Sequence, residues 1–159
     1  MKKTFETEAK FRVTLNDIKK LNMNFNFFKQ KNVIYTLEKS FLRIRSENNN
    51  TFITFKGEKK ENKLNVREEI EFIVDTNIDV VKKLFSSIGF KDYFEYEKLR
   101  ANFSLNNCIL SIDKLPNSEI YLEIEGDEKS VLETIDVLGY SEREIISKNY
   151  MEVLKDGLH

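Results

Sequence analysis

The segment 5–11, Phe-Glu-Thr-Glu-Ala-Lys-Phe, alternates apolar and charged residues with a period close to two. A β-strand directs successive side chains to opposite faces of its sheet, so Glu6, Glu8 and Lys10 share one face and the apolar residues share the other. Such a strand normally belongs to an antiparallel sheet with one face on the core and one in water. The alternative is a strand whose charged face lines a cavity.

The same alternation recurs along the chain and predicts eight strands. They are expected at residues 5–11, 24–35, 41–45, 51–56, 66–74, 90–103, 108–113 and 120–126. Asparagine tolerates left-handed backbone angles, so we predict turns at 48–50 and 106–107. The polar segment 57–65 is expected to be a mobile loop.

Apolar residues at helical spacing predict four helices between or after these strands. Thr14 and Asp17 form a capping box that begins the first helix. Two further helices, at 77–88 and 129–138, are each followed by a glycine suited to a helix C-terminus. A second capping box at Ser141 predicts a tail helix that carries the apolar residues from Ile145 to Leu154.

Each predicted strand has one apolar face and one polar face. The in-phase polar residues are Glu6, Glu8, Lys10, Arg43, Arg45, Thr54, Lys56, Arg67, Glu69, Glu71, Lys98, Arg100, Ser111, Asp113, Tyr121, Glu123 and Glu125. In an open sheet, helices would cover the apolar face and water the other. In a closed barrel, helices would cover the outside and the charges would crowd the inside. Eight strands suffice to close a barrel around one small ligand, and closure removes the exposed edges.

The signs of the charges favour the barrel, because pairs at i and i+2 repeat one sign. Among the in-phase residues named above, Glu-x-Glu occurs three times, and Arg-x-Arg and Lys-x-Arg once each. Like charges side by side are unfavourable in a sheet unless an opposite charge lies between them. Carboxylate pairs suit a divalent cation, and Arg/Lys pairs suit an anion with several oxygens. Together they indicate a polyphosphate bound with magnesium or manganese, with the solvated open sheet as the alternative.

Composition limits the other classes of function. The 159 residues fit a single domain, 1–159, and a net charge of -1 gives no global indication of nucleic acid or an anionic membrane as partner. No apolar run approaches the ~20 residues of a membrane span. With one cysteine, Cys108, and one histidine, His159, thiolate zinc sites and histidine-based catalysis are disfavoured, so a metal would bind to oxygen. We expect a cytoplasmic protein.

Glu6-Thr7-Glu8-Ala9-Lys10 resembles the E-x-E-x-K signature of the CYTH superfamily, the triphosphate tunnel metalloenzymes. The resemblance covers about residues 5–154 in unbroken order. Further matches are Leu42-Arg43-Ile44-Arg45 to L-R-I-R, Thr54-Phe55-Lys56-Gly57 to T-x-K-G, Arg67-Glu68-Glu69-Ile70-Glu71 to R-x-E-x-E, Lys98-Leu99-Arg100 to K-x-R, Asp113 with Tyr121-Leu122-Glu123-Ile124-Glu125-Gly126 to D…(F/Y)-x-E-I-E-G, and Lys148-Asn149-Tyr150 to K-S-Y.

The resemblance implies an α+β fold, an eight-stranded antiparallel closed β-barrel with helices packed on the outside. It implies that Mg²⁺ or Mn²⁺ binds to Glu6, Glu8, Asp113, Glu123 and Glu125. The implied triphosphate-binding residues are Lys10, Arg43, Arg45, Lys56, Lys98, Arg100 and Lys148, the last of which could equally be an exposed helix lysine. Glu69 and Glu71 would form a second acidic cluster or hold basic side chains in place. Lys10 would accept a proton beside Glu6 and Glu8 only if its pKa is depressed.

The leading hypothesis is a metal-dependent hydrolase of an inorganic, thiamine or nucleoside triphosphate. The alternatives are a class IV adenylyl cyclase and a polyphosphate- or nucleotide-binding module without turnover. Residues 30–40 lack the aspartates that family members commonly carry before L-R-I-R, and the histidine–phenylalanine element of some cyclases has no counterpart. Both differences weigh against the cyclase. The resemblance also makes a homodimer a plausible assembly.

Overall fold

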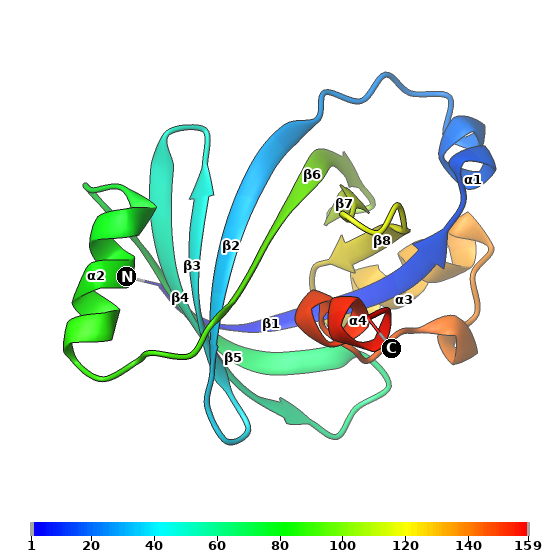
Figure 1. Ribbon diagram of the computed structural model, residues 1–159. Helices are drawn as coiled ribbons and strands as arrows, with labels where there is room; N and C mark the ends of the chain where they lie inside the picture. Colours follow the sequence, from blue (N-terminus) through cyan, green and yellow to red (C-terminus); the bar gives the residue numbers. More distant parts are fainter. Residues whose placement is uncertain (1, 159) are drawn as a thin grey trace.

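Eight antiparallel strands close into a barrel in the computed structural model, which describes residues 2–158 and so leaves out His159. Figure 1 shows the strands as a ring, in the order β1-β5-β4-β3-β2-β6-β7-β8. They are β1 (Lys2–Val13), β2 (Phe28–Thr36), β3 (Phe41–Glu47), β4 (Asn50–Lys60), β5 (Asn65–Val74), β6 (Phe94–Leu105), β7 (Cys108–Lys114) and β8 (Ile120–Glu125). The predicted closed barrel is confirmed, and the open sheet is not.

β1 closes the barrel, because it pairs with β5 along its first half and with β8 along its second. Glu6 lies opposite Arg67 of β5, and Lys10 lies opposite Glu123 of β8. The E-x-E-x-K strand is therefore the seam of the ring, and its charged face points inward.

Two asparagine pairs make the tight hairpin turns that the sequence predicts. Asn48 and Asn49 connect β3 to β4 with φ values of 47° and 65°. Asn106 and Asn107 connect β6 to β7 with φ values of 49° and 60°. Positive φ at both central residues is the geometry of the two-residue turn that matches the twist of the strands. These turns fix the register that sends the charged residues inward.

Helices cover the apolar outer faces of the barrel. They are α1 (Leu15–Lys20), α2 (Ile78–Ser87), α3 (Glu128–Leu138) and α4 (Tyr150–Asp156), with a 3-10 turn η1 (Glu142–Glu144). Val131 and Ile135 of α3 are buried in one cluster with Phe11. Val81 and Phe85 of α2 pack in a second cluster on β2 and β3.

α4 does not lie on the outer wall of the barrel with the other helices. In Figure 1 it sits within the opening of the ring rather than on the outer wall. Its residues Tyr150, Met151 and Leu154 are buried in one cluster with Ile34 and Tyr96, which face inward. The apolar side of α4 thus closes one end of the barrel.

Several predicted boundaries also change. β4 continues to Lys60, so the loop expected at 57–65 shrinks to residues 61–64. Residues 24–27 and 90–93 lie before β2 and β6 rather than within them. The predicted tail helix is broken: only η1 and α4 are helical, and residues 145–149 run between them without helical hydrogen bonds.

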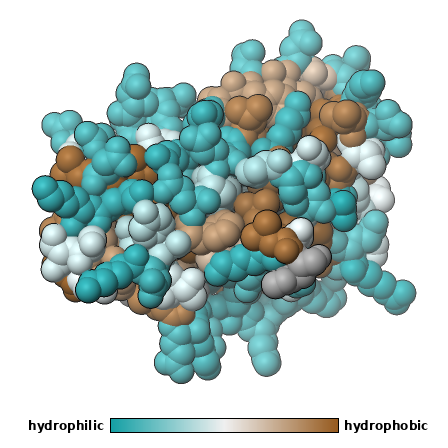
Figure 2. All heavy atoms as spheres, in the orientation of Figure 1, coloured by the Kyte–Doolittle hydropathy of each residue, from teal (hydrophilic) through white to brown (hydrophobic). Residues whose placement is uncertain are grey.

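The face drawn in Figure 2 is mostly hydrophilic, with apolar side chains showing between charged ones. Among residues 2–158, none of the helices combines the length and apolar character needed to cross a membrane.

Candidate functional site

The inner faces of the strands enclose a cavity of about 210 Å³. Its charged lining residues are Glu6, Glu8, Lys10, Arg43, Arg45, Lys56, Lys59, Arg67, Glu69, Glu71, Lys98, Arg100, Glu123 and Glu125. The structure therefore brings together every predicted site residue except Asp113 and Lys148. Eight lysines and arginines face six glutamates in a space closed at one end by α4.

Lys56 joins two of the glutamates on the β1–β5–β4 side. It donates a hydrogen bond to Glu6 and lies 2.9 Å from Glu69. Burial alone would raise the pKa of Glu6, but the charge and hydrogen bond of Lys56 lower it to about 2. Arg43 pairs with Glu71 in the same way, at 3.3 Å. Of the two roles predicted for Glu69 and Glu71, the structure supports holding basic side chains in place.

On the opposite wall of the cavity, Asp113 of β7 holds the basic residues of β6 in place. Its side chain is fully buried, and it accepts hydrogen bonds from Arg100 Nε at 2.7 Å, from Lys98 at 2.9 Å and from the Tyr150 hydroxyl at 2.6 Å. Arg100 also bonds Glu123, 2.5 Å away. Because its oxygens are occupied by these donors and it does not line the cavity, Asp113 is not placed where the predicted metal ligand would be.

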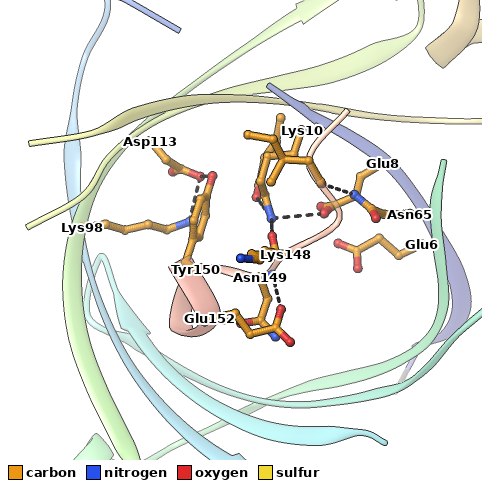
Figure 3. A network of polar contacts seen from close by, with 12 residues as sticks. Glu6, Glu8, Lys10, Asn65, Lys98, Asp113, Lys148, Asn149, Tyr150 and Glu152 are labelled. Atoms are coloured by element: carbon orange, nitrogen blue, oxygen red, sulfur yellow. Dashed lines mark hydrogen bonds and ion pairs between the residues drawn. The ribbon is translucent and has the colours of Figure 1, made fainter. Parts of the chain in front are cut away.

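Lys10 lies at the centre of the network in Figure 3. Its Nζ is 3.6 Å from Glu8 and 3.4 Å from Glu123, donates to the Lys148 carbonyl at 3.2 Å and sits 4.4 Å from the centre of the Tyr150 ring. Burial alone would lower the pKa of Lys10, but the two glutamates raise it. The condition for Lys10 as a proton acceptor is therefore not met, and it acts as a cation.

The glutamates of β1 and β8 are crowded with one another. Burial and the charge of Glu123 raise the pKa of Glu8, and burial at the cavity edge with the charge of Glu6 raises that of Glu125 to about 7. The pKa values of Glu6 and Glu123, which lie beside lysines and arginines, are lowered instead. Carboxylates held close together suit a hard divalent cation, which binds through oxygen. Glu6, Glu8, Glu123 and Glu125 are the cavity carboxylates that could hold such a cation. Among residues 2–158 no three acidic side chains yet converge as a metal site, since Glu6, Glu8 and Glu123 each face a lysine or arginine.

Two cavity cations have an asparagine partner instead of a carboxylate. Arg45 Nε donates to Asn32 Oδ1 at 2.8 Å, and Lys59 Nζ donates to Asn65 Oδ1 at 3.2 Å. Burial and the neighbouring Arg43 and Arg100 lower the pKa of Arg45 to about 10, and burial with Arg67 and Lys10 lowers that of Lys59 to about 8. Neither makes an ion pair with a described carboxylate, so their charge is not neutralised by a paired anion.

Lys148 does not reach the cavity with its side chain. It precedes α4, is 59% exposed and pairs with Asp156 at 2.5 Å. Only its backbone carbonyl takes part in the site, as the acceptor for Lys10. Of the two roles left open for this residue, the structure shows the exposed lysine.

Several polar lining residues were not predicted as site residues, and these are Lys59, Asn65, Arg67, Tyr96, Asn149 and Tyr150. Lys59 falls within the loop expected at 57–65, and strict alternation after Lys56 would point its side chain outward. A register shift between Lys56 and Lys59 turns it inward instead, as a β-bulge does. Arg67 carried a signal, because it is in phase with Glu69 and Glu71. Tyr96 shares the phase of Lys98 but carried no charge to mark it.

Fold and site together define an antiparallel barrel with an internal cavity lined by paired and unpaired charges. The chain belongs to the CYTH domain family, which it matches over residues 4–150.

Three similar proteins illustrate the range of the match. A Methanocaldococcus jannaschii protein named "Putative adenylate cyclase" is 28% identical over 92% of this chain and 97% of its own. A Pyrococcus horikoshii structure is 29% identical, with a TM-score of 0.79 over 92% of this chain and 98% of its own. A Hippeastrum structure, a "Putative adenylyl cyclase" described as revealing a dominant triphosphatase activity, is 17% identical with a TM-score of 0.62 over 96% of both chains. The last likeness shows the fold alone.

Proposed function

We propose that this protein is a divalent-metal-dependent hydrolase that cleaves a phosphoanhydride bond of a triphosphate held in the barrel cavity. The observation that carries the proposal is the cavity inside the closed barrel, in which eight cations face six glutamates. A triphosphate chain carries several negative charges, and its hydrolysis depends on charge neutralisation and alignment more than on covalent chemistry.

Glu6, Glu8, Glu123 and Glu125 would hold the metal, because they are the crowded carboxylates of the cavity. When bound, Mg²⁺ or Mn²⁺ neutralises charge on the phosphate under attack and lowers the pKa of a water molecule. Glu69 and Glu71 would keep Lys56 and Arg43 oriented toward the substrate.

Two groups of cations, those with and those without a carboxylate partner, would bind the triphosphate in different ways. Arg100 is fixed by Asp113 and Glu123, and Lys10 is held between Glu8 and Glu123. Each can move its charge toward a phosphate oxygen once the metal engages the glutamates. Arg45 and Lys59 have no carboxylate partner to give up, so they would form the first contacts with the anion.

The size of the cavity favours a triphosphate chain over a whole nucleotide. Its volume of about 210 Å³ is below the roughly 300 Å³ at which pockets for larger organic ligands begin. The Hippeastrum protein, which shares the fold, is described as having a dominant triphosphatase activity, and this supports the proposal. The name of the Methanocaldococcus relative keeps adenylyl cyclase as the second candidate, with the ribose 3′-hydroxyl in place of water.

One assay separates the candidates. The protein is incubated with Mg²⁺ or Mn²⁺ and tripolyphosphate, thiamine triphosphate or ATP, and orthophosphate, pyrophosphate and cyclic AMP are measured. We expect orthophosphate. Cyclic AMP with pyrophosphate would establish the cyclase, and tight binding without product would establish a binding module.

Two variants connect the activity to the cavity. Glu8→Ala and Arg45→Ala should each abolish turnover, whereas Lys129→Ala, at an 85% exposed side chain on α3, should not change it. Turnover at the wild-type rate in both cavity variants would place the reaction elsewhere.

A further inference from the structure

Arg45 differs from Arg43 and Arg100, because its side chain is not paired with any carboxylate of the described residues. Arg43 pairs with Glu71, and Arg100 pairs with both Asp113 and Glu123. Arg45 is held by an amide and makes no ion pair with a described carboxylate. A guanidinium beside a carboxylate is already neutralised, so it must exchange one anion for another to bind a ligand. Arg45 has no such exchange to make.

Asn32 is built into the barrel for this contact. It lies opposite Arg45 in the β2–β3 pair and opposite Tyr96 in the β2–β6 pair, and it is fully buried. Its Oδ1 accepts the bond from Arg45 Nε, which leaves the outer nitrogens of the guanidinium free to face the cavity that Arg45 lines. Its Nδ2 is buried and finds no hydrogen-bond partner among the described residues.

An unpaired buried donor destabilises a folded protein. An aspartate at position 32 would accept the same bond from Arg45 and would also remove the unpaired N–H group. For folding alone, an acid is therefore the better residue at this position. The asparagine becomes the better choice if the charge of Arg45 must stay available to a ligand in the cavity.

Resting on the triphosphatase function proposed above, we infer that Asn32 is a positioning residue for the substrate: it orients Arg45, which lines the cavity, without neutralising its charge. Asn65 of β5 repeats this arrangement with Lys59 of β4, accepting a hydrogen bond from Lys59 Nζ at 3.2 Å. There the second amide donor is already used, since Asn65 Nδ2 bonds the Ile146 carbonyl at 3.0 Å.

Asn32→Asp tests the inference, because it keeps the acceptor and adds only a charge. Tripolyphosphate binding is measured by calorimetry with Mg²⁺ present, beside the thermal unfolding of the ligand-free protein. We expect the dissociation constant to rise at least about tenfold, the scale of losing one charged hydrogen bond. The unfolding temperature should stay equal or rise. A residue that only holds Arg45 in place would show no loss of affinity.

Asn77→Asp is the matched control. Asn77 is exposed and caps α2 by accepting from the Asp79 and Val80 amides, contacts that a carboxylate retains. It adds the same charge on the outside of the barrel, and its affinity should stay within about twofold of the wild type.

The outcomes separate this inference from the function on which it rests. If the wild type does not bind tripolyphosphate, the proposed function fails and the inference with it. If the wild type binds and Asn32→Asp binds equally well, only the inference is overturned. Asn32→Ser gives a second test should the aspartate variant not fold: it leaves Arg45 charged but unsupported, and we expect weaker binding. Unchanged affinity in that variant would also overturn the role of Asn32.

Discussion

At the scale of the residue, the charged side chains of the cavity differ in the kind of partner that they contact. Lys10, Lys56 and Arg100 each contact two carboxylates, whereas Arg45 and Lys59 rest on amides. A buried charge is tolerated when it is paired and becomes expensive when its partner is removed. The same residue can therefore serve the ligand-free fold through one contact and the ligand through another, and substitutions should separate the two roles.

Asp113 should matter most for folding. Asp113→Asn leaves Lys98 and Arg100 without their shared buried anion, so we expect a loss of about 3–5 kcal/mol in the free energy of unfolding, measured with urea at pH 7. Asp156→Asn removes an ion pair that is 58% exposed on the aspartate side, and its effect should be within about 1 kcal/mol. Equal effects of the two substitutions would contradict the buried arrangement.

Glu125 should make the metal-free protein less stable as pH rises. Its folded-state pKa is about 7 against an ordinary value of 4.5, so between these values the folded state holds a proton that the unfolded state has lost. Stability contributed by this group is therefore present below pH 4.5 and lost as pH rises through 7. In chelator, Glu125→Gln should gain stability relative to the wild type between pH 5 and pH 8.

The comparison needs a glutamate outside the cavity. Glu61→Gln, in the exposed loop between β4 and β5, should show a constant difference from the wild type across this pH range. A pH-independent difference for Glu125→Gln as well would contradict the crowding of carboxylates at the cavity edge.

At the scale of the element, local sequence predicted what depends on local sequence. The asparagine turns, the capping box of α1 at Thr14 and the left-handed end of α3 at Gly139 were all predictable from neighbouring residues. The bulge of β4 was not, because it is defined by pairing with β5 and leaves no trace in the alternation of β4. It is also what turns Lys59 into the cavity, so one missed irregularity hid one site residue.

The placement of α4 was equally hidden from sequence. Its apolar residues predict burial but not against which surface, and the inner faces that receive them were predicted to be polar. Tyr150 reconciles the two, because its ring stacks near the ammonium groups of Lys10 and Lys98 while its hydroxyl bonds Asp113. An aromatic side chain with a polar tip can be buried among charges in this way.

Tyr150→Phe should isolate the contribution of that hydroxyl. It removes one hydrogen bond to a buried carboxylate and keeps the ring, so we expect a loss of about 1.5–3 kcal/mol in the free energy of unfolding. Tyr140→Phe is the control: Tyr140 stacks on Phe11 outside the barrel at a centroid distance of 4.7 Å, and its hydroxyl makes no hydrogen bond with the described residues. Equal losses would mean that Tyr150 contributes through packing alone.

At the scale of the whole molecule, closure of the barrel was predictable because like charges recur on strands that are far apart in sequence. What sequence could not show is how those charges pair across the ring. The i and i+2 repeats predicted acidic and basic walls, whereas the folded chain interleaves them: Glu6 meets Lys56 of β4, and Arg100 meets Glu123 of β8. Without ligand, the cavity largely neutralises itself.

This self-neutralisation predicts that metal and triphosphate bind cooperatively. The triphosphate must draw lysines and arginines from their glutamates, and the metal must draw the same glutamates from their cations, so each ligand makes the other's exchange easier. The coupling is reciprocal by thermodynamic linkage and should be about 1–3 kcal/mol.

The coupling between metal and triphosphate is measured by thermal unfolding at fixed free concentrations of Mg²⁺ and tripolyphosphate, which also associate in solution. The stabilisation with both should exceed the sum of the two separate effects, and Glu123→Gln should reduce the excess because this glutamate contacts both Lys10 and Arg100. Strictly additive effects in the wild type would mean that the ligands use separate residues, contrary to the shared pairs that the structure shows.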